Sequence, residues 1–215
     1  MPQPELDKIW IFRITHIDNL RYALLNGLFS YGHAQADPDY INIGDSNLIQ
    51  QRHDHQVKIN PPNGQLGDYI PFYFGPLSPM LLNIKTGQRN ITQRPQKDIV
   101  YLCCNLRNII SNCGEWCFTD GHAKTAITTF YNNTDDIDQV DRGLAHERYW
   151  HATDEDLDRM RKKQAEFLVK HSVPPGCISN VVVFDAERQA QVVEIKKELN
   201  LDLNIHINPK GKYYY

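Results

Sequence analysis

The chain has 215 residues, of which 41% are hydrophobic and 23% are charged, and its formal net charge is −3. This length and balance predict one globular domain over residues 1–215 with a sizeable core. The charge excludes a strongly basic nucleic-acid-binding protein, so any contact with DNA must come from a local group of basic residues.

The N-terminal part of the chain predicts a strand followed by a helix. Residues 9–14 are β-branched and aromatic, which is typical of a strand. Asp18 is a good helix N-cap and Gly27 a good C-terminal cap, so we expect a helix between them. His16 then lies where the strand ends and the helix begins. Side chains at such junctions often point into clefts.

A long polar segment separates this unit from the next strand. Residues 29–67 lack hydrophobic periodicity, and we expect them to form a functional loop that carries Arg52. Residues 68–82 alternate aromatics with prolines, which predicts a short strand, a tight turn and a helix that begins near Pro79. Residues 98–106 predict a second clear strand.

The second half of the chain is less regular. We expect residues 118–122 to lead into a helical stretch through Phe130, and residues 131–152 to be irregular. Residues 154–163 mix acids and bases, which indicates a solvated short helix or turn. The later elements are a strand at 178–184, a helix capped by Asp185 that ends near Leu199, and a last strand at 203–207. Strands outnumber helices without regular alternation, which predicts an α+β fold.

Several classes of site are disfavoured by what the chain lacks. No Gly-x-Gly-x-x-Gly follows the first strand, so a Rossmann NAD⁺ site is excluded. No export signal or membrane-spanning stretch is evident, so we expect a cytoplasmic protein with no membrane contact and free thiols. Cys113 and Cys117 followed by His122 could belong to a metal site. Their spacing is loose and no fourth ligand stands out, so we expect no metal.

Five segments, in order, resemble the DarT family of DNA ADP-ribosyltransferases: residues 13–20, 40–44, 68–82, 118–123 and 164–166. One segment alone would be a weak signal, but five in order over most of the chain are specific. The resemblance implies an ADP-ribosyltransferase fold, in which a split, mostly antiparallel sheet with flanking helices holds NAD⁺ in a central cleft. NAD⁺ would be a substrate, and the chemistry would need no metal.

The resemblance also implies a function. ADP-ribose would be transferred from NAD⁺ to a base in single-stranded DNA, with release of nicotinamide. Residues 40–44 look more like the thymine-modifying branch of the family than the guanine-modifying one. The family implies a toxin of a toxin–antitoxin system, whose partner is a DarG-like macrodomain antitoxin.

Two candidate catalytic residues follow from the match. Glu166 matches the family's catalytic glutamate, whose carboxylate would bond the ribose 2-OH as an oxocarbenium-like centre forms. The apolar run after it places it on a buried strand, although the residues alone also allow an exposed acid. Arg52 matches the arginine assigned to NAD⁺ contact and thymine activation. An arginine is almost never deprotonated, so we expect it to stabilise the forming anion rather than act as a general base.

The remaining candidates line the two substrate sites. His16 would hold NAD⁺, with Ile17, Asp18 and Gly27 flanking the same pocket, although His16 could equally be structural. Tyr73 could stack on nicotinamide or belong to the core. The candidate DNA contacts lie in a segment that resembles the family's substrate-recognition region: His122, Tyr149, Arg159, Arg161 and Lys162. Basic side chains there would contact phosphates and aromatic ones would stack on bases, or the segment is a mixed-charge solvated surface.

Two other functions stay open at this point. The chain could be an enzyme of the same fold with a protein, RNA or water acceptor. It could also be a non-catalytic module that binds single-stranded DNA. Arg52 together with the candidate DNA-recognition segment favours the DNA-modifying enzyme over another acceptor. The presence of His16, Arg52 and Glu166 argues against a non-catalytic module.

Overall fold

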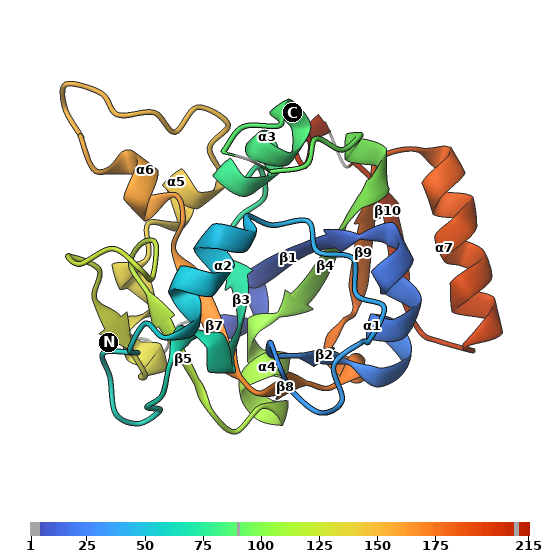
Figure 1. The fold of residues 1–215 in the computed structure, drawn as a ribbon, viewed down its shortest axis with the longest axis horizontal. Coiled ribbons are helices and arrows are strands. Elements are labelled where there is room, and N and C mark those ends of the chain that lie inside the picture. The colour runs from blue at the N-terminus through green and yellow to red at the C-terminus, as the bar shows by residue number, and fades with distance from the viewer. Residues whose placement is uncertain (1–4, 90, 209–210) are drawn as a thin grey trace.

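The computed structural model describes residues 5–89, 91–208 and 211–215. It is an α+β fold built around an eight-stranded sheet (Figure 1). The strands are β1 (Trp10–His16), β2 (Leu28–Phe29), β3 (Tyr69–Tyr73), β4 (Ile99–Asn105), β5 (Trp116–Thr119), β6 (Phe130–Tyr131), β7 (Glu166–Lys170), β8 (Ser172–Val173), β9 (Asn180–Val183) and β10 (Asn204–Ile207). The helices are α1 (Leu20–Asn26), α2 (Ser46–His53), α3 (Pro79–Thr86), α4 (Leu106–Asn112), α5 (Arg142–His146), α6 (Arg159–Lys162) and α7 (Ala186–Glu198).

The sheet is mostly antiparallel and is split near its middle. Its strand order is β10-β9-β4-β1-β3-β7-β5-β6, and β9 and β10 run parallel. Strands β1 and β4 pair along their full length, from Trp10 opposite Asn105 to His16 opposite Ile99. Strands β1 and β3 are in register at a single pair, Phe12 and Tyr73. The fold class that the sequence predicted is therefore confirmed, with the split between β1 and β3.

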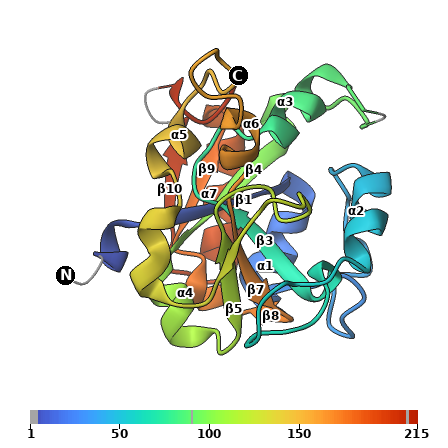
Figure 2. The same cartoon turned by 90° about the vertical axis from the view of Figure 1, so that its left-hand side faces the viewer.

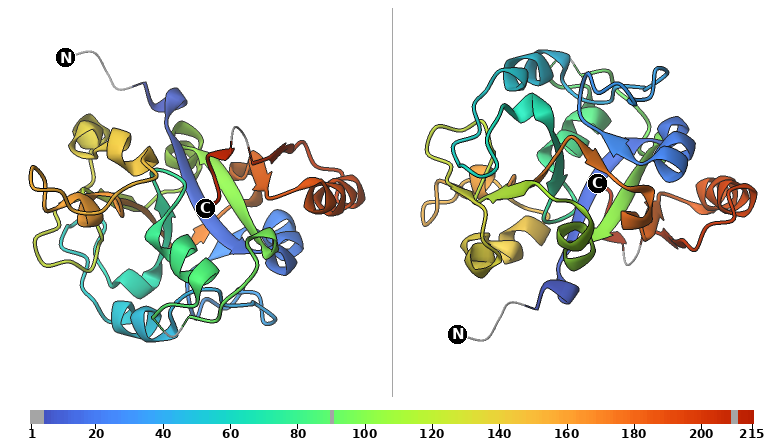
Figure 3. Two further views of the ribbon diagram at one scale, coloured as in Figure 1. Left: turned by 90° about the horizontal axis from the view of Figure 1, so that it is seen from above. Right: turned by 90° about the horizontal axis from the view of Figure 1, so that it is seen from below.

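Both faces of the central strands are covered. Side chains alternate across a strand, so Ile11 of β1 packs on one face together with α1, α4 and α7. Phe12 of β1 and Tyr101 of β4 pack on the other face, against Leu81 of α3. Figure 2 shows α3 and α4 on opposite sides of the central strands. Helix α7 lies beyond β9 and β10 (Figure 3). Burial on both faces explains why β4 is a continuous apolar run from Ile99 to Cys104.

The junction between β1 and α1 differs in one detail from the expectation. Strand β1 ends at His16, and Gly27 ends α1 with a φ of 95°, which favours glycine. A short 3-10 helix, Ile17–Asn19, is inserted between them. The expected cap at Asp18 is wrong, because the His16 imidazole takes that role and accepts a hydrogen bond from the Asp18 N–H at 3.3 Å.

Helix α2 corrects the expected long loop. Arg52 lies in the last turn of α2 rather than on an irregular segment. The helix begins after Asp45, whose carboxylate accepts a hydrogen bond from the Leu48 N–H at 3.0 Å. No residue of α2 is fully buried, so the sequence has no apolar stripe from which a helix could be predicted.

The helix expected after residue 122 is also wrong. Residues 120–129, which we call the β5–β6 loop, form turns. Asp120 and Thr129 close this loop: the Thr129 N–H donates to Asp120 Oδ1 at 2.9 Å, and the Asp120 N–H donates to the Thr129 carbonyl at 3.4 Å. The loop returns the chain antiparallel from β5 to β6.

Lys163, expected in a solvated turn, is buried instead. Its ammonium donates to the backbone carbonyls of Pro76, Ala145 and Glu147 at 2.9, 2.6 and 2.8 Å. At the same junction, a Cβ on Gly75 would collide with the Ala145 carbonyl. These contacts join the turn after β3 to α5 and to the start of β7.

Other expected elements lie where the sequence predicts them. Helix α3 begins at Pro79, and the Asp185 carboxylate caps α7 by accepting a hydrogen bond from the Arg188 N–H at 3.0 Å. None of the described helices is long and apolar enough to cross a membrane.

Candidate active site

A cavity of about 630 Å³ opens at the split between β1 and β3. This volume is in the usual range for a small-molecule site. The Arg13 guanidinium spans the split and donates to the Pro71 carbonyl at 3.0 Å. The wall is formed by β1, the end of α1, the polar segment after it, α2 and β3, including Arg13, Thr15, Gly27, Arg52, Tyr69 and Pro71.

Asn19 fixes the polar segment over this cavity. Its side-chain amide donates to the Ile41 carbonyl at 2.9 Å and accepts from the Ile41 N–H at 2.8 Å. The same amide donates to the Thr15 hydroxyl of β1 at 2.9 Å. The segment that carries residues 40–44 is thus fastened to β1 and α1 through one buried side chain.

An ion pair between α2 and β7 lies beside the cavity. Arg52 Nη1 and Nη2 donate to Glu166 Oε1 and Oε2 at 2.9 and 2.6 Å. The Ala123 N–H of the β5–β6 loop also donates to Oε1, at 3.0 Å. The Glu166 side chain is 2% exposed and that of Arg52 is 15% exposed. A bidentate arginine–carboxylate pair of this kind is among the stronger polar interactions in proteins.

The pair keeps both groups charged despite their burial. Burial by itself would raise the pKa of Glu166, but the charge and hydrogen bonds of Arg52 outweigh it and lower that pKa. Burial opposes the charge on Arg52, and Glu166 nonetheless raises the Arg52 pKa. Tyr73 is opposite Glu166 in the β3–β7 register. Burial and the Glu166 carboxylate raise the pKa of Tyr73 to about 12, so it is a neutral phenol.

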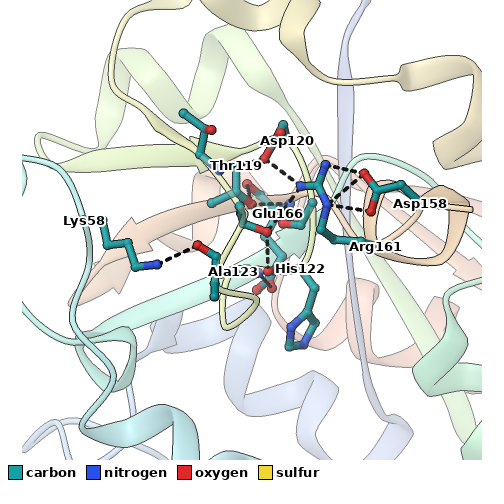
Figure 4. A network of polar contacts seen from close by, with 12 residues as sticks. Lys58, Thr119, Asp120, His122, Ala123, Asp158, Arg161 and Glu166 are labelled. Atoms are coloured by element: carbon teal, nitrogen blue, oxygen red, sulfur yellow. Dashed lines mark hydrogen bonds and ion pairs between the residues drawn. The ribbon is translucent and has the colours of Figure 1, made fainter.

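Arg161 holds the β5–β6 loop against Glu166 (Figure 4). Its guanidinium lies between two carboxylates: Nη1 bonds Asp120 Oδ1 at 2.9 Å and Nη2 bonds Asp158 Oδ2 at 2.6 Å. Its backbone carbonyl accepts from the His122 N–H at 3.0 Å. These contacts fix the loop on both sides of residue 121 and so aim the Ala123 N–H at Glu166.

The predicted NAD⁺ contacts fall into two groups. Gly27 and Arg52 lie in the cavity wall. The wall formed by the described residues does not include the other four: His16, Ile17, Asp18 and Tyr73. The His16 imidazole already caps the 3-10 helix, and burial lowers its pKa, so it is neutral at pH 7. A role in NAD⁺ binding for these four residues stays a prediction.

The predicted DNA contacts also differ among themselves. Tyr149 is 77% exposed, so its ring is available to a base. Arg161 is committed to two carboxylates, and the Lys162 ammonium is paired with Asp156 at 2.9 Å. A phosphate would have to compete with those pairs. A phosphate contact of Arg161 therefore stays a prediction, and it requires that the phosphate displace Asp120 or Asp158.

Arg159 and His122 are each partly buried. Arg159 Nη2 donates to the Tyr149 carbonyl at 3.1 Å. Burial lowers the pKa of His122, so its imidazole is neutral at pH 7. Trp150, next to Tyr149, is buried. Of the described residues, no group of three or more His, Cys, Asp or Glu side chains is placed to hold a metal ion.

Sequence reasoning missed the backbone contacts that hold Glu166. The Glu166 N–H donates to the Thr119 hydroxyl at 3.1 Å, and the Ala123 N–H donates to the carboxylate. Both residues lie in the segment 118–123 that resembled the family, but a backbone N–H is present at every residue except proline. No residue type could therefore have pointed to Ala123.

Comparisons with known proteins point to one family. The family described as "ssDNA thymidine ADP-ribosyltransferase, DarT" matches residues 12–215. A DNA ADP-ribosyl transferase of Escherichia coli O127:H6 is 34% identical over 207 residues, which are 96% of this chain and 94% of the relative. A Thermosipho africanus DNA ADP-ribosyl transferase–DNA ADP-ribosyl glycohydrolase fusion protein is 26% identical, and the match covers 95% of this chain but 49% of the fusion.

Solved structures of Thermus sp. 2.9 DarT are similar in fold and 29% identical in sequence. The structure in complex with ADP-ribosylated single-stranded DNA has a TM-score of 0.84 and covers 100% of this chain and 99% of that chain. The structure in complex with NAD⁺ has a TM-score of 0.79 and covers 99% of both chains. The chain therefore belongs to the DarT family of single-stranded-DNA thymidine ADP-ribosyltransferases.

Proposed function

We propose that this chain transfers ADP-ribose from NAD⁺ to a thymine base in single-stranded DNA and releases nicotinamide. The observation that carries the proposal is the buried Arg52–Glu166 pair beside a cavity of about 630 Å³. The Thermus relative named in complexes with NAD⁺ and with ADP-ribosylated single-stranded DNA supports both substrates.

NAD⁺ occupies the cavity between β1 and β3. Gly27 lets the chain pass close to the neighbouring strand, because a Cβ there would collide with the Val173 carbonyl. His16, Ile17 and Asp18, at the junction of β1 and α1, complete the NAD⁺ contacts. Tyr73 lies beside Glu166 and can stack on the nicotinamide ring from there.

Glu166 promotes cleavage of the bond between nicotinamide and ribose. The electron pair of that bond leaves with nicotinamide, which neutralises its ring, and positive charge grows on the anomeric carbon. A carboxylate that accepts a hydrogen bond from the ribose 2-OH binds more tightly as this charge grows, so it stabilises the transition state more than the ground state. The lowered pKa keeps Glu166 ionised for this task.

Arg52 acts on the second substrate. A thymine ring nitrogen must lose its proton to solvent before it can form the new bond to the anomeric carbon. A guanidinium keeps its own proton at neutral pH, so it does not abstract the proton of thymine. It stabilises the thymine anion by its charge and so lowers the cost of deprotonation. Arg52 lies in the cavity wall and bonds Glu166, which supports a role for this one cation toward both substrates.

Single-stranded DNA reaches this pair across the segment 122–162. An unpaired base can enter the site without the cost of opening a duplex. The exposed Tyr149 stacks on a base, and Arg159 orients it through its backbone carbonyl. His122 and Lys162 lie along the same segment as further DNA contacts, and Arg161 contributes by holding the β5–β6 loop.

One relative points to a partner protein for this chain. The Thermosipho relative joins a transferase to a DNA ADP-ribosyl glycohydrolase in one fusion protein. We infer that this chain is the toxin of a toxin–antitoxin pair, and that a DarG-like macrodomain antitoxin removes its mark.

Nicotinamide release in the presence of defined oligonucleotides tests the proposal. The expected result is release that depends on a single-stranded, thymine-containing oligonucleotide, together with a mass gain of one ADP-ribose on that strand. A matched oligonucleotide without thymine and the same strand in a duplex should give little of either product, and Glu166→Gln should give neither. Release without a DNA adduct would contradict the proposal and identify a NAD⁺ glycohydrolase or an enzyme with another acceptor.

A further inference from the structure

Residues 148–150 are held by tyrosines near the end of the described chain. The Trp150 indole N–H donates to the Tyr215 hydroxyl at 2.9 Å, across 65 positions of sequence. The Tyr215 hydroxyl in turn bonds the Leu77 carbonyl. Arg148 Nη1 donates to the Tyr214 carbonyl at 3.2 Å, and the Arg148 guanidinium carbon lies 5.5 Å from the centre of the Tyr215 ring. Figure 2 shows the chain between α5 and α6 beside these last residues.

The tyrosines are themselves fixed to the sheet. Tyr214 is buried, and its hydroxyl bonds the Ile99 carbonyl of β4 at 2.9 Å and the Val182 carbonyl of β9 at 3.1 Å. Tyr215 exchanges two hydrogen bonds with the Gln96 side chain, at 2.7 and 2.8 Å. The tyrosines at 214 and 215 are therefore a rigid support rather than a loosely packed tail.

Tyr149 lies between the two anchored residues and points away from the protein. Its neighbours Arg148 and Trp150 are held by residues 214 and 215, and its own carbonyl accepts from Arg159 at 3.1 Å. Its side chain is nevertheless 77% exposed. An aromatic ring on a fixed backbone loses little conformational entropy when a flat partner stacks on it. Fixed exposed aromatics are what sequence-tolerant binding of single-stranded bases requires.

We propose that Tyr215 is a positioning residue for the DNA substrate: its hydroxyl holds Trp150 and so fixes Tyr149 as a stacking platform for a base that flanks the modified one. The inference rests on the proposed function, because it needs single-stranded DNA as the acceptor. It adds a residue outside the segment 122–162 that controls how that segment meets DNA. Tyr215 is not among the described residues that line the cavity.

Tyr215→Phe tests the inference with little change of shape. The variant keeps the ring under Arg148 and removes only the hydroxyl that joins Trp150 to Leu77. Tyr213→Phe is the matched control, since it removes a hydroxyl from a tyrosine two positions away, which bonds its neighbours through its backbone N–H and carbonyl. Trp150→Phe removes the other partner of the same hydrogen bond and serves as a second variant if Tyr215→Phe is poorly folded.

The experiment measures kcat, the KM for DNA and the KM for NAD⁺ separately in each variant. Stacking of one base on an aromatic corresponds to roughly 5- to 150-fold in binding. We expect Tyr215→Phe and Trp150→Phe to raise the KM for a single-stranded oligonucleotide by about fivefold or more. The kcat and the KM for NAD⁺ should stay within about twofold, and Tyr213→Phe should match the wild type.

Tyr149→Ala completes the experiment. It should raise the KM for DNA at least as much, and adding Tyr215→Phe to it should cause no further rise, because the platform is already absent. An unchanged KM for DNA in Tyr149→Ala, or a rise of the NAD⁺ KM equal to that for DNA in Tyr215→Phe, would overturn the inference. Failure of the wild type to modify DNA at all would instead contradict the proposed function.

Discussion

Glu166→Gln should destabilise the fold as well as abolish transfer, because it leaves the Arg52 guanidinium buried without its counter-charge. The wild-type carboxylate accepts two hydrogen bonds from Arg52 and one from the Ala123 N–H. The glutamine amide retains one acceptor oxygen and turns its NH₂ group toward a donor. Breaking a buried ion pair costs roughly 3–5 kcal/mol.

The lower end of that range applies here. The Arg52 side chain is 15% exposed, so water reaches the unpaired guanidinium in part. We therefore expect a loss of about 3 kcal/mol in the free energy of unfolding. For a chain of this size, that loss corresponds to a fall of roughly 6–12 °C in Tm.

Urea denaturation of a double-mutant cycle measures this effect. Arg52→Met alone should also destabilise the protein, since it leaves the Glu166 carboxylate buried and unpaired. The double variant removes both charges and should recover most of either loss. Wild-type stability in Glu166→Gln, or two single losses that simply add in the double variant, would refute the view that the two charges depend on each other.

Three further predictions concern pH and packing. The pKa of Glu166 is lower in the folded protein than its ordinary value of 4.5, so the ionised carboxylate stabilises the fold fully above pH 4.5. This stabilisation is lost as the pH falls through the lower, folded-state pKa. The difference in unfolding free energy between the wild type and Glu166→Gln, measured by urea denaturation, should therefore be constant near pH 7 and shrink in acid. Gly75→Ala should lower the free energy of unfolding by about 1–3 kcal/mol, because its Cβ meets the Ala145 carbonyl; a Tm equal to the wild type would show that the backbone yields freely. Burial lowers the pKa of Lys163 to about 7, so above that pH the unfolded chain binds more protons at Lys163 than the folded chain does. The free energy of unfolding of the wild type should therefore rise between pH 7 and 9 relative to that of Lys163→Met. A difference between the two proteins that does not depend on pH would contradict this.

The strands were predictable where burial left a pattern in the sequence. Strand β4 is apolar from Ile99 to Cys104 because both of its faces are covered. Glu166 could be placed on a strand because the buried residues Phe167 to Val169 follow it. Helix α2 could not be predicted, since it lies on the surface and buries no residue fully. Patterns of burial report only on elements that face the core.

The sequence alone could not show which charged side chains pair within the site. Glu166 and Arg52 could each be proposed as catalytic, but they are 114 positions apart, and only the fold brings the last turn of α2 beside the start of β7. Arg161 looked like a surface cation because its ion-pair partner Asp120 is 41 positions away. The sequence shows which groups carry charge, and only the fold shows which charges neutralise each other.

Fragmentation of the modified oligonucleotide by tandem mass spectrometry tests the central claim most directly. A single-stranded oligonucleotide with one thymine would be treated with NAD⁺ and either the wild type or Glu166→Gln. We expect an adduct on the base of that thymine with the wild type and none with the variant. An adduct on a phosphate or on another base, or an adduct formed equally by Glu166→Gln, would contradict it.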